Sequence, residues 1–118
     1  FAVKAHSPTQ LISTLSGGNQ QKVMLGRALV SEARILLLNE PTRGVDVGTK
    51  VEIHELVRDL AREGNAVIVS SSDVPELDLV SDRCLVLSAG RITGDLVGPS
   101  LNEDNILACA VAHATIGV

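Results

Sequence analysis

The sequence predicts an α/β fold with a mostly parallel sheet, flanking helices and a C-terminal β-hairpin. Short aliphatic runs alternate with amphipathic stretches of about ten residues or more, which is the pattern of βαβ units. The core must be aliphatic, because 45% of the 118 residues are hydrophobic but only one is Phe and none is Tyr or Trp. Strands rich in Val, Ile and Leu are typical of parallel sheets that are covered on both faces.

Hydrophobic periodicity places two helices and two strands in the first half of the chain. Ser16 can cap the first helix, and Gly64 can close the second. In chain order, the expected elements are a helix over 23–29, a strand over 33–38, a helix over 51–61 and a strand over 66–69.

The second half begins with three serines, Ser70 to Ser72, and ends in a small apolar segment. Gly90 provides a turn between two short apolar runs, which predicts a hairpin. In chain order, the expected elements are a short helix over 74–80, a strand over 84–87, its hairpin partner over 92–97 and a helical tail over 101–112.

Charge and composition exclude several classes of function. The formal net charge is −4, whereas a nucleic-acid-binding domain usually presents a basic face. The near absence of aromatic side chains also removes the stacking platforms that bind single strands. We therefore expect no nucleic-acid partner. No stretch reaches the roughly 20 apolar residues that cross a bilayer, so we also expect no membrane-spanning helix.

The turn formed by Ser16, Gly17, Gly18 and Asn19 directly precedes the first helix. Adjacent glycines let the backbone approach a ligand closely, and the first helical N–H groups point outward at the positive end of the helix dipole. These features suit a phosphate group. A plain turn before a capped helix explains the same residues equally well, so both interpretations stay open here.

Asn39 and Glu40 end the first expected strand, at the edge where α/β folds place their ligands. A carboxylate in this position can accept a proton from an attacking water, and a neighbouring oxygen can help to hold Mg²⁺. The alternative is an ordinary strand end that leaves the core.

Together the two segments resemble the ATP-binding cassette (ABC) ATPases. Leu15–Gln20 is similar to the signature motif of that family, Ile35–Glu40 to its Walker B strand and Arg43–Asp46 to its D-loop. Ser72 stands where most members carry the switch histidine. The wording of these motifs is similar to the second, C-terminal cassette of bacterial importers of simple sugars such as ribose, galactose or xylose.

The resemblance implies the C-terminal half of a P-loop NTPase, with residues 1–118 forming a partial ATP-binding domain. The expected phosphate loop, G-x-x-x-x-G-K-[ST], is absent from the sequence. We therefore expect the chain to be inactive by itself. Uncovered aliphatic strands would also favour its association with a second copy.

The resemblance also implies roles for individual residues. Glu40 and Ser72 would be catalytic, and Asn39 would contact the Mg²⁺ that accompanies ATP. Asp46 would lie at the interface with a second cassette. The nucleotide contacts implied by the signature motif are Ser16, Gly17, Gly18, Asn19 and Gln20.

Three of these residues depart from the common family pattern, the first being Asn19, which stands where many members have Gln. Asn39 replaces the usual Asp, so it contributes no negative charge to Mg²⁺. Ser72 replaces the usual His, so it offers no cation to the transferring phosphoryl group. Slowed hydrolysis is expected wherever these residues act, although serine is usual at the switch position of the sugar-importer subgroup.

The function implied is that of an ATP-hydrolysing subunit, peripheral to the cytoplasmic face of a bacterial inner membrane. Its partners would be a second cassette, a transmembrane permease and, indirectly, a sugar-binding protein. The alternatives are a non-transport ABC ATPase of DNA repair or translation and a catalytically degenerate regulatory cassette.

Overall fold

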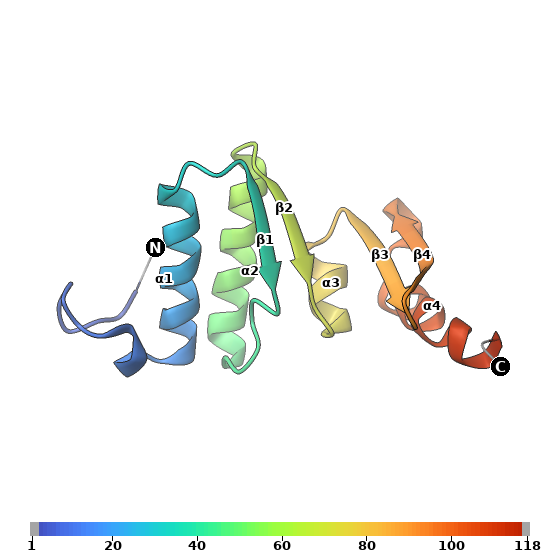
Figure 1. Ribbon diagram of the computed structural model, residues 1–118, viewed down its shortest axis with the longest axis horizontal. Helices are drawn as coiled ribbons and strands as arrows, with labels where there is room; N and C mark the ends of the chain where they lie inside the picture. The colour runs from blue at the N-terminus through green and yellow to red at the C-terminus, as the bar shows by residue number, and fades with distance from the viewer. Residues whose placement is uncertain (1–2, 117–118) are drawn as a thin grey trace. The chain divides into compact units, whose positions relative to one another are not determined.

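Two units of the chain, residues 1–70 and 71–118, hold most of their contacts within themselves, and each is described by itself. The computed structural model describes the backbone of residues 3–116 and the side chains of residues 3–112 (Figure 1). In the first unit the elements are η1 (Ile12–Thr14), α1 (Gly17–Val30), β1 (Ile35–Asn39), α2 (Val47–Arg62) and β2 (Ala66–Ser70).

Side-chain caps set the starts of both long helices in the first unit. Ser16 caps α1, and Asp46 caps α2, each by accepting a hydrogen bond from a backbone N–H in the first turn. The helix α2 ends at Arg62, Glu63 is its C-cap residue, and Gly64 after it adopts a φ of 95°. Glycine takes this left-handed conformation without steric cost, which is why it commonly follows a helix end. The Ser16 cap and the closing glycine therefore act as the sequence predicts, whereas the Asp46 cap is an additional finding.

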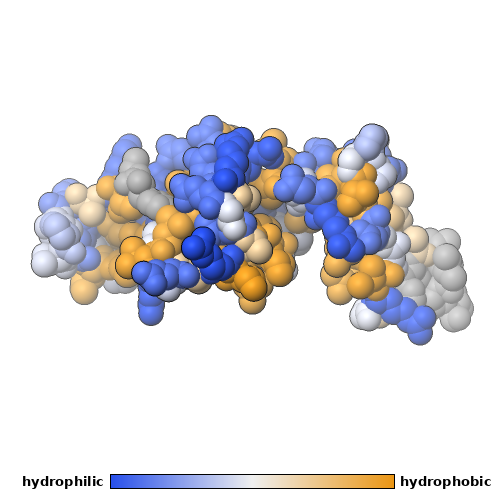
Figure 2. All heavy atoms as spheres, turned by 90° about the horizontal axis from the view of Figure 1, so that it is seen from above, coloured by the Kyte–Doolittle hydropathy of each residue, from blue (hydrophilic) through white to orange (hydrophobic). Residues whose placement is uncertain are grey.

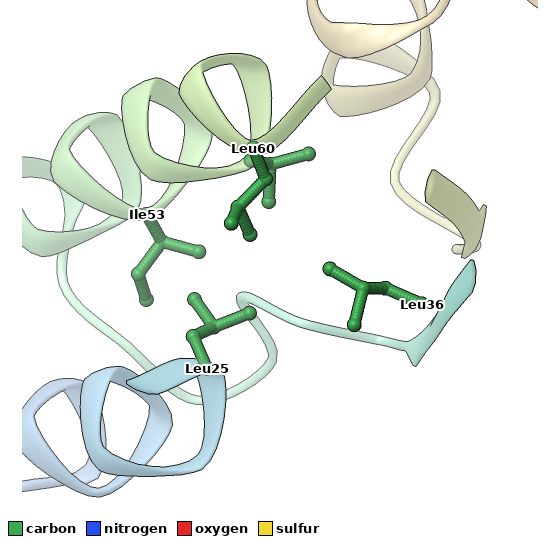
Figure 3. Close-up of a cluster of buried hydrophobic side chains, with 5 residues drawn as sticks. Leu25, Leu36, Ile53 and Leu60 are labelled. Carbon is green, nitrogen blue, oxygen red and sulfur yellow. The ribbon is translucent and has the colours of Figure 1, made fainter. Parts of the chain in front are cut away.

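The strands β1 and β2 pair in parallel, with Ile35 opposite Ala66 and Asn39 opposite Ser70. One face of this pair packs against the two helices. Figure 3 shows Leu25 of α1, Leu36 of β1 and two residues of α2, Ile53 and Leu60, converging on one cluster, which also contains Val57. Each buried aliphatic side chain contributes about 1.5–3 kcal/mol to stability, so this cluster is the main source of cohesion in the unit.

The opposite face of the β1–β2 pair is uncovered. Ile35, Leu37 and Ile68 keep 65%, 74% and 58% of their surface exposed. Hydrophobic residues also reach the surface elsewhere among the described residues, as Figure 2 shows. Parallel strands are normally covered on both faces, so this face departs from the expected arrangement.

The second unit consists of α3 (Val74–Val80), β3 (Arg83–Ser88), β4 (Arg91–Val97), η2 (Gly98–Ser100) and α4 (Glu103–Ile116). The strands β3 and β4 form an antiparallel hairpin, closed by Ala89 and Gly90 with φ values of 49° and 77°. Two successive residues with positive φ are typical of a tight hairpin turn. The predicted hairpin is therefore confirmed.

The helix α4 covers one face of the hairpin. Cys84 and Val86 of β3 are buried against Ile106 of α4, and the hydroxyl of Thr93 donates to the carbonyl oxygen of Cys109 at 2.8 Å. Among the described residues, only β1 and β2 pair in parallel. The tight turn between β3 and β4 makes these two strands pair with each other in the antiparallel direction. No helix in the described part of the chain is both long enough and apolar enough to cross a membrane.

Candidate functional site

The turn before α1 is organised by its own side chains. The Ser16 Oγ accepts a hydrogen bond from the backbone N–H of Asn19 at 3.3 Å and another from the Asn19 Nδ2 at 2.9 Å. The Gln20 Nε2 donates to the carbonyl oxygen of Leu15 at 2.9 Å. The first N–H groups of an α-helix have no partner within the helix, so Gly17 and Gly18 present backbone donors at this end. The geometry suits an anion.

Gly18 lies directly against α2 and is buried. A Cβ at this position would lie 2.1 Å from the Cγ2 of Thr49, a distance that real Cβ atoms essentially never show. A Cβ on Gly17 would lie 3.5 Å from the carbonyl oxygen of Gly44. The turn formed by Ser16, Gly17, Gly18 and Asn19, which we call the signature turn, therefore lies beside the segment Arg43–Asp46.

A buried lysine joins the same two helices one turn further along. The side chain of Lys22 on α1 is only 7% exposed, and its Nζ forms an ion pair with the Oε2 of Glu52 on α2, whose side chain is 55% exposed. A buried ammonium without a carboxylate partner would be costly, so the pair favours one fixed register of α1 against α2.

Asp46 occupies the cap position of α2 beside the signature turn. Its Oδ1 accepts a hydrogen bond from the backbone N–H of Thr49 at 2.8 Å. This bond holds the pKa of Asp46 below its ordinary value, and a hydrogen bond from the Thr49 side chain is the next largest cause. The nearby positive charge of Lys22 lowers the pKa by a smaller amount. Asp46 is therefore ionised at neutral pH and stabilises the helix start.

This cap predicts a pH dependence of stability. The pKa of Asp46 is lower in the folded chain than its ordinary value of 3.8, so its contribution is present above that value and lost as the pH falls through the lowered pKa. Asp46→Asn keeps the acceptor oxygen but does not titrate, so we expect its urea midpoint to change less than that of the wild type between about pH 5 and pH 2. Asp46→Ala removes the cap and should lower the midpoint already at pH 7. Parallel pH curves for wild type and Asp46→Asn would contradict the assignment.

The end of β1 carries the two residues of the expected Walker B site. Asn39 is exposed, and Glu40 has a φ of 48°, an uncommon conformation for a residue with a side chain. The Glu40 N–H donates to the carbonyl oxygen of Ser70 at 2.7 Å, which continues the β1–β2 pairing by one bond. Pro41 and Thr42 behind it are buried. The carboxylate of Glu40 thus follows a well-anchored strand end.

The side-chain oxygens at this strand end are of the kinds that bind Mg²⁺ in proteins. Mg²⁺ is bound through one or two protein oxygens together with water and phosphate oxygens, and Asn39 and Glu40 supply an amide and a carboxylate. No group of three or more His, Cys, Asp or Glu side chains that could hold a metal ion occurs among the described residues. A magnesium ion here would therefore depend on the phosphates of a nucleotide.

Ser72 belongs to the second unit, where it is exposed just before α3. Its neighbour Ser71 holds the loop: the Ser71 Oγ donates to the Oε2 of Glu76 at 2.5 Å and accepts from the N–H of Asp73 at 3.0 Å. Glu76 is 2% exposed. The role of Ser71 was not predicted from the sequence, although an Asp cap followed three residues later by Glu is a recognisable pattern of helix starts.

The structure thus brings part of the expected site together. In the turn over residues 16–20, Gly17 lies beside Gly44 and Val45, which lead to Asp46. Asn39 and Glu40 are adjacent at the end of β1. Ser72 lies in the other unit.

Comparison with known proteins shows which family the chain resembles. The sequence profile described as "ABC transporter" matches residues 2–43. The "Ribose import ATP-binding protein RbsA 2" of Agrobacterium fabrum is 53% identical over 108 residues, which are 92% of this chain and 21% of that protein. The "Xylose import ATP-binding protein XylG" of Moorella thermoacetica is 49% identical over 108 residues, with the same shares of the two chains. The chain is therefore similar to ABC ATP-binding proteins over 92% of its length, and its residues 2–43 match the ABC transporter family.

A solved structure supports the ABC fold. The crystal structure of an ATP-binding cassette of an ABC transporter in its ADP conformation matches with a TM-score of 0.74 at 25% identity, over 89% of this chain and 41% of that one. The expected α/β class of a P-loop NTPase is confirmed, as is the resemblance of the signature and Walker B segments to ABC ATPases. The chain spans about a fifth of the length of the curated relatives it matches.

Proposed function

We propose that residues 1–118 form part of an ATP-binding domain in the ATPase subunit of a bacterial importer of simple sugars. Two relatives about 50% identical over 92% of the chain are named for ribose and xylose import, and this likeness carries the proposal. The partners would be a second cassette and a transmembrane permease. A sugar-binding protein would deliver the sugar to the permease. The subunit would then be peripheral to the cytoplasmic face of the inner membrane.

The chemistry proposed for the site follows from the positions of its donors and acceptors. Ser16 and the N–H groups of Gly17 and Gly18 would bind the γ-phosphate of ATP held by the second cassette, and Asp46 would lie at the interface between the two. Glu40 would accept a proton from the attacking water, and Ser72 would donate a hydrogen bond to a phosphate oxygen. Mg²⁺, held with the help of Asn39, would supply positive charge to the phosphates.

Hydrolysis by the full-length gene product, purified with a sugar permease, tests this proposal. The expected result is ATP turnover that rises when the permease and a sugar-loaded binding protein are present. Turnover that responds instead to DNA ends or to ribosomes would favour the DNA repair or translation alternative. A protein that binds the permease but turns over no ATP would favour the degenerate regulatory cassette.

Asn39→Asp is expected to increase turnover at limiting Mg²⁺. The substitution adds a negative charge at the strand end and keeps the size of the side chain. We expect the Mg²⁺ concentration for half-maximal hydrolysis to fall by about tenfold, equivalent to about 1.4 kcal/mol. Asn65→Asp, at the half-buried turn after α2, is the matched control and should leave that concentration unchanged. An unaltered Mg²⁺ requirement in Asn39→Asp would show that Asn39 does not act on the metal.

A further inference from the structure

The Ser16 hydroxyl in the signature turn has its acceptor capacity filled. A hydroxyl oxygen has two lone pairs and one O–H group. The Ser16 Oγ accepts from the backbone N–H of Asn19 at 3.3 Å and from the Asn19 Nδ2 at 2.9 Å. Both lone pairs are therefore occupied from within the turn, so the O–H group is left to donate outward, and Ser16 is exposed.

The orientation of the Asn19 amide is fixed by a second contact. Its Oδ1 accepts from the backbone N–H of Lys4 at 3.0 Å. A backbone N–H can only donate, so the oxygen of the amide must face Lys4 and the NH₂ group must face Ser16. The assignment of oxygen and nitrogen in this side chain therefore follows from the hydrogen bonds.

We infer that Asn19 is a positioning residue that acts through Ser16 and does not itself bind phosphate. The inference rests on the proposed function and deepens it. By filling the acceptor side of the Ser16 oxygen, the Asn19 amide turns the hydroxyl into a donor alone. Together with the free N–H groups at the start of the helix, the hydroxyl then offers hydrogen-bond donors to the oxygens of a phosphate group.

Asn19→Asp separates this role from a structural one. The change keeps the oxygen that faces Lys4 and places a negative charge in the first turn of α1, where it stabilises a helix. It also replaces the NH₂ donor by an acceptor. The Ser16 hydroxyl should then donate to the new carboxylate and no longer to a phosphate oxygen. We expect kcat/KM for ATP hydrolysis by the full-length gene product to fall by about 10- to 100-fold, as for the loss of one hydrogen bond to a charged group. The thermal midpoint should not fall.

The double-mutant cycle with Ser16→Ala shows whether Asn19 acts through Ser16. In the Ser16→Ala background, Asn19→Asp should lower kcat/KM by less than about threefold, since only its charge still acts on the phosphate. The matched control is Asn105→Asp, because Asn105 holds the corresponding position of α4: its N–H donates to the Asn102 Oδ1 and its Nδ2 to the carbonyl oxygen of Ser100. It should leave kcat/KM unchanged.

Equal losses from Asn19→Asp in the two backgrounds would overturn the inference, as would no loss in the wild-type background. A wild type that hydrolyses no ATP would instead reject the proposed function. In that case the exchange rate of the Asn19 side-chain NH₂ protons, measured by NMR in the same protein, decides the inference. Faster exchange in Ser16→Ala than in the wild type would support the contact, and equal rates would overturn it.

Discussion

Gly18→Ala should destabilise the first unit strongly, whereas Gly26→Ala on the same helix should stabilise it. A Cβ on Gly18 would lie 2.1 Å from the Thr49 Cγ2 and 3.0 Å from its Cβ, and nothing lies within 4 Å of a Cβ on Gly26. Overpacking of this kind costs about 1–3 kcal/mol in the free energy of unfolding. Alanine in place of an unhindered helical glycine contributes up to about 1 kcal/mol of stability. Urea denaturation of the two variants measures both effects.

The same clash should disturb the signature turn. The helix α1 can accommodate the added methyl group only by moving away from α2, which would separate Ser16 and Gly17 from the turn before Asp46. Thr49→Ala removes the Cγ2, so the double variant Gly18→Ala/Thr49→Ala should recover part of the lost stability. Equal unfolding free energies for Gly18→Ala and Gly26→Ala would show that the close approach of the two helices is not maintained in solution.

Glu40→Gln should abolish nearly all ATP hydrolysis by the full-length gene product without preventing nucleotide binding. The amide has the shape of the carboxylate but cannot accept a proton from water, and a positioned base contributes about 10²- to 10⁴-fold to a rate. We expect kcat to fall by a factor in this range, while the affinity for ATP stays within about threefold. Steady-state kinetics and equilibrium nucleotide binding measure the two quantities.

Glu63→Gln is the matched control for this experiment. Glu63 is exposed at the end of α2, and its neutralisation should leave kcat unchanged. If Glu40→Gln kept more than about half of the wild-type turnover, another group would have to be the base.

The local elements could be predicted because their signals lie within a few residues of one another. The helix over 74–80 occurs with the predicted bounds, and Ser16 and Gly64 act at the ends of α1 and α2 as the sequence indicates. Elsewhere the boundaries differ by up to six residues, as at the start of α1, which is Gly17–Val30 where 23–29 was expected. The strand expected over 33–38, for example, is Ile35–Asn39, because pairing with β2 decides where it begins and ends.

The contacts that shape the candidate site could not be predicted in the same way. The glycines of the signature turn suggested a close approach of a ligand, whereas Gly18 is in contact with Thr49, 31 positions later in the sequence. The ion pair between Lys22 and Glu52 likewise joins two helices that only tertiary packing brings together. The assignment of the motifs to the ABC family needed no such contacts, since it depends on residue types and their spacing.

The left-handed backbone conformation of Glu40 lowers the stability of the fold at a residue that we propose to be catalytic. A side chain in this conformation costs about 1 kcal/mol or more, which glycine would avoid. The lowest-energy residue for the fold at position 40 is therefore one that lacks the carboxylate. A screen for thermostable variants would favour Glu40→Gly, whereas a screen for activity would reject it. Selection has accepted a less stable strand end at this position, and opposite preferences in the two screens would mark position 40 as functional without any knowledge of the reaction.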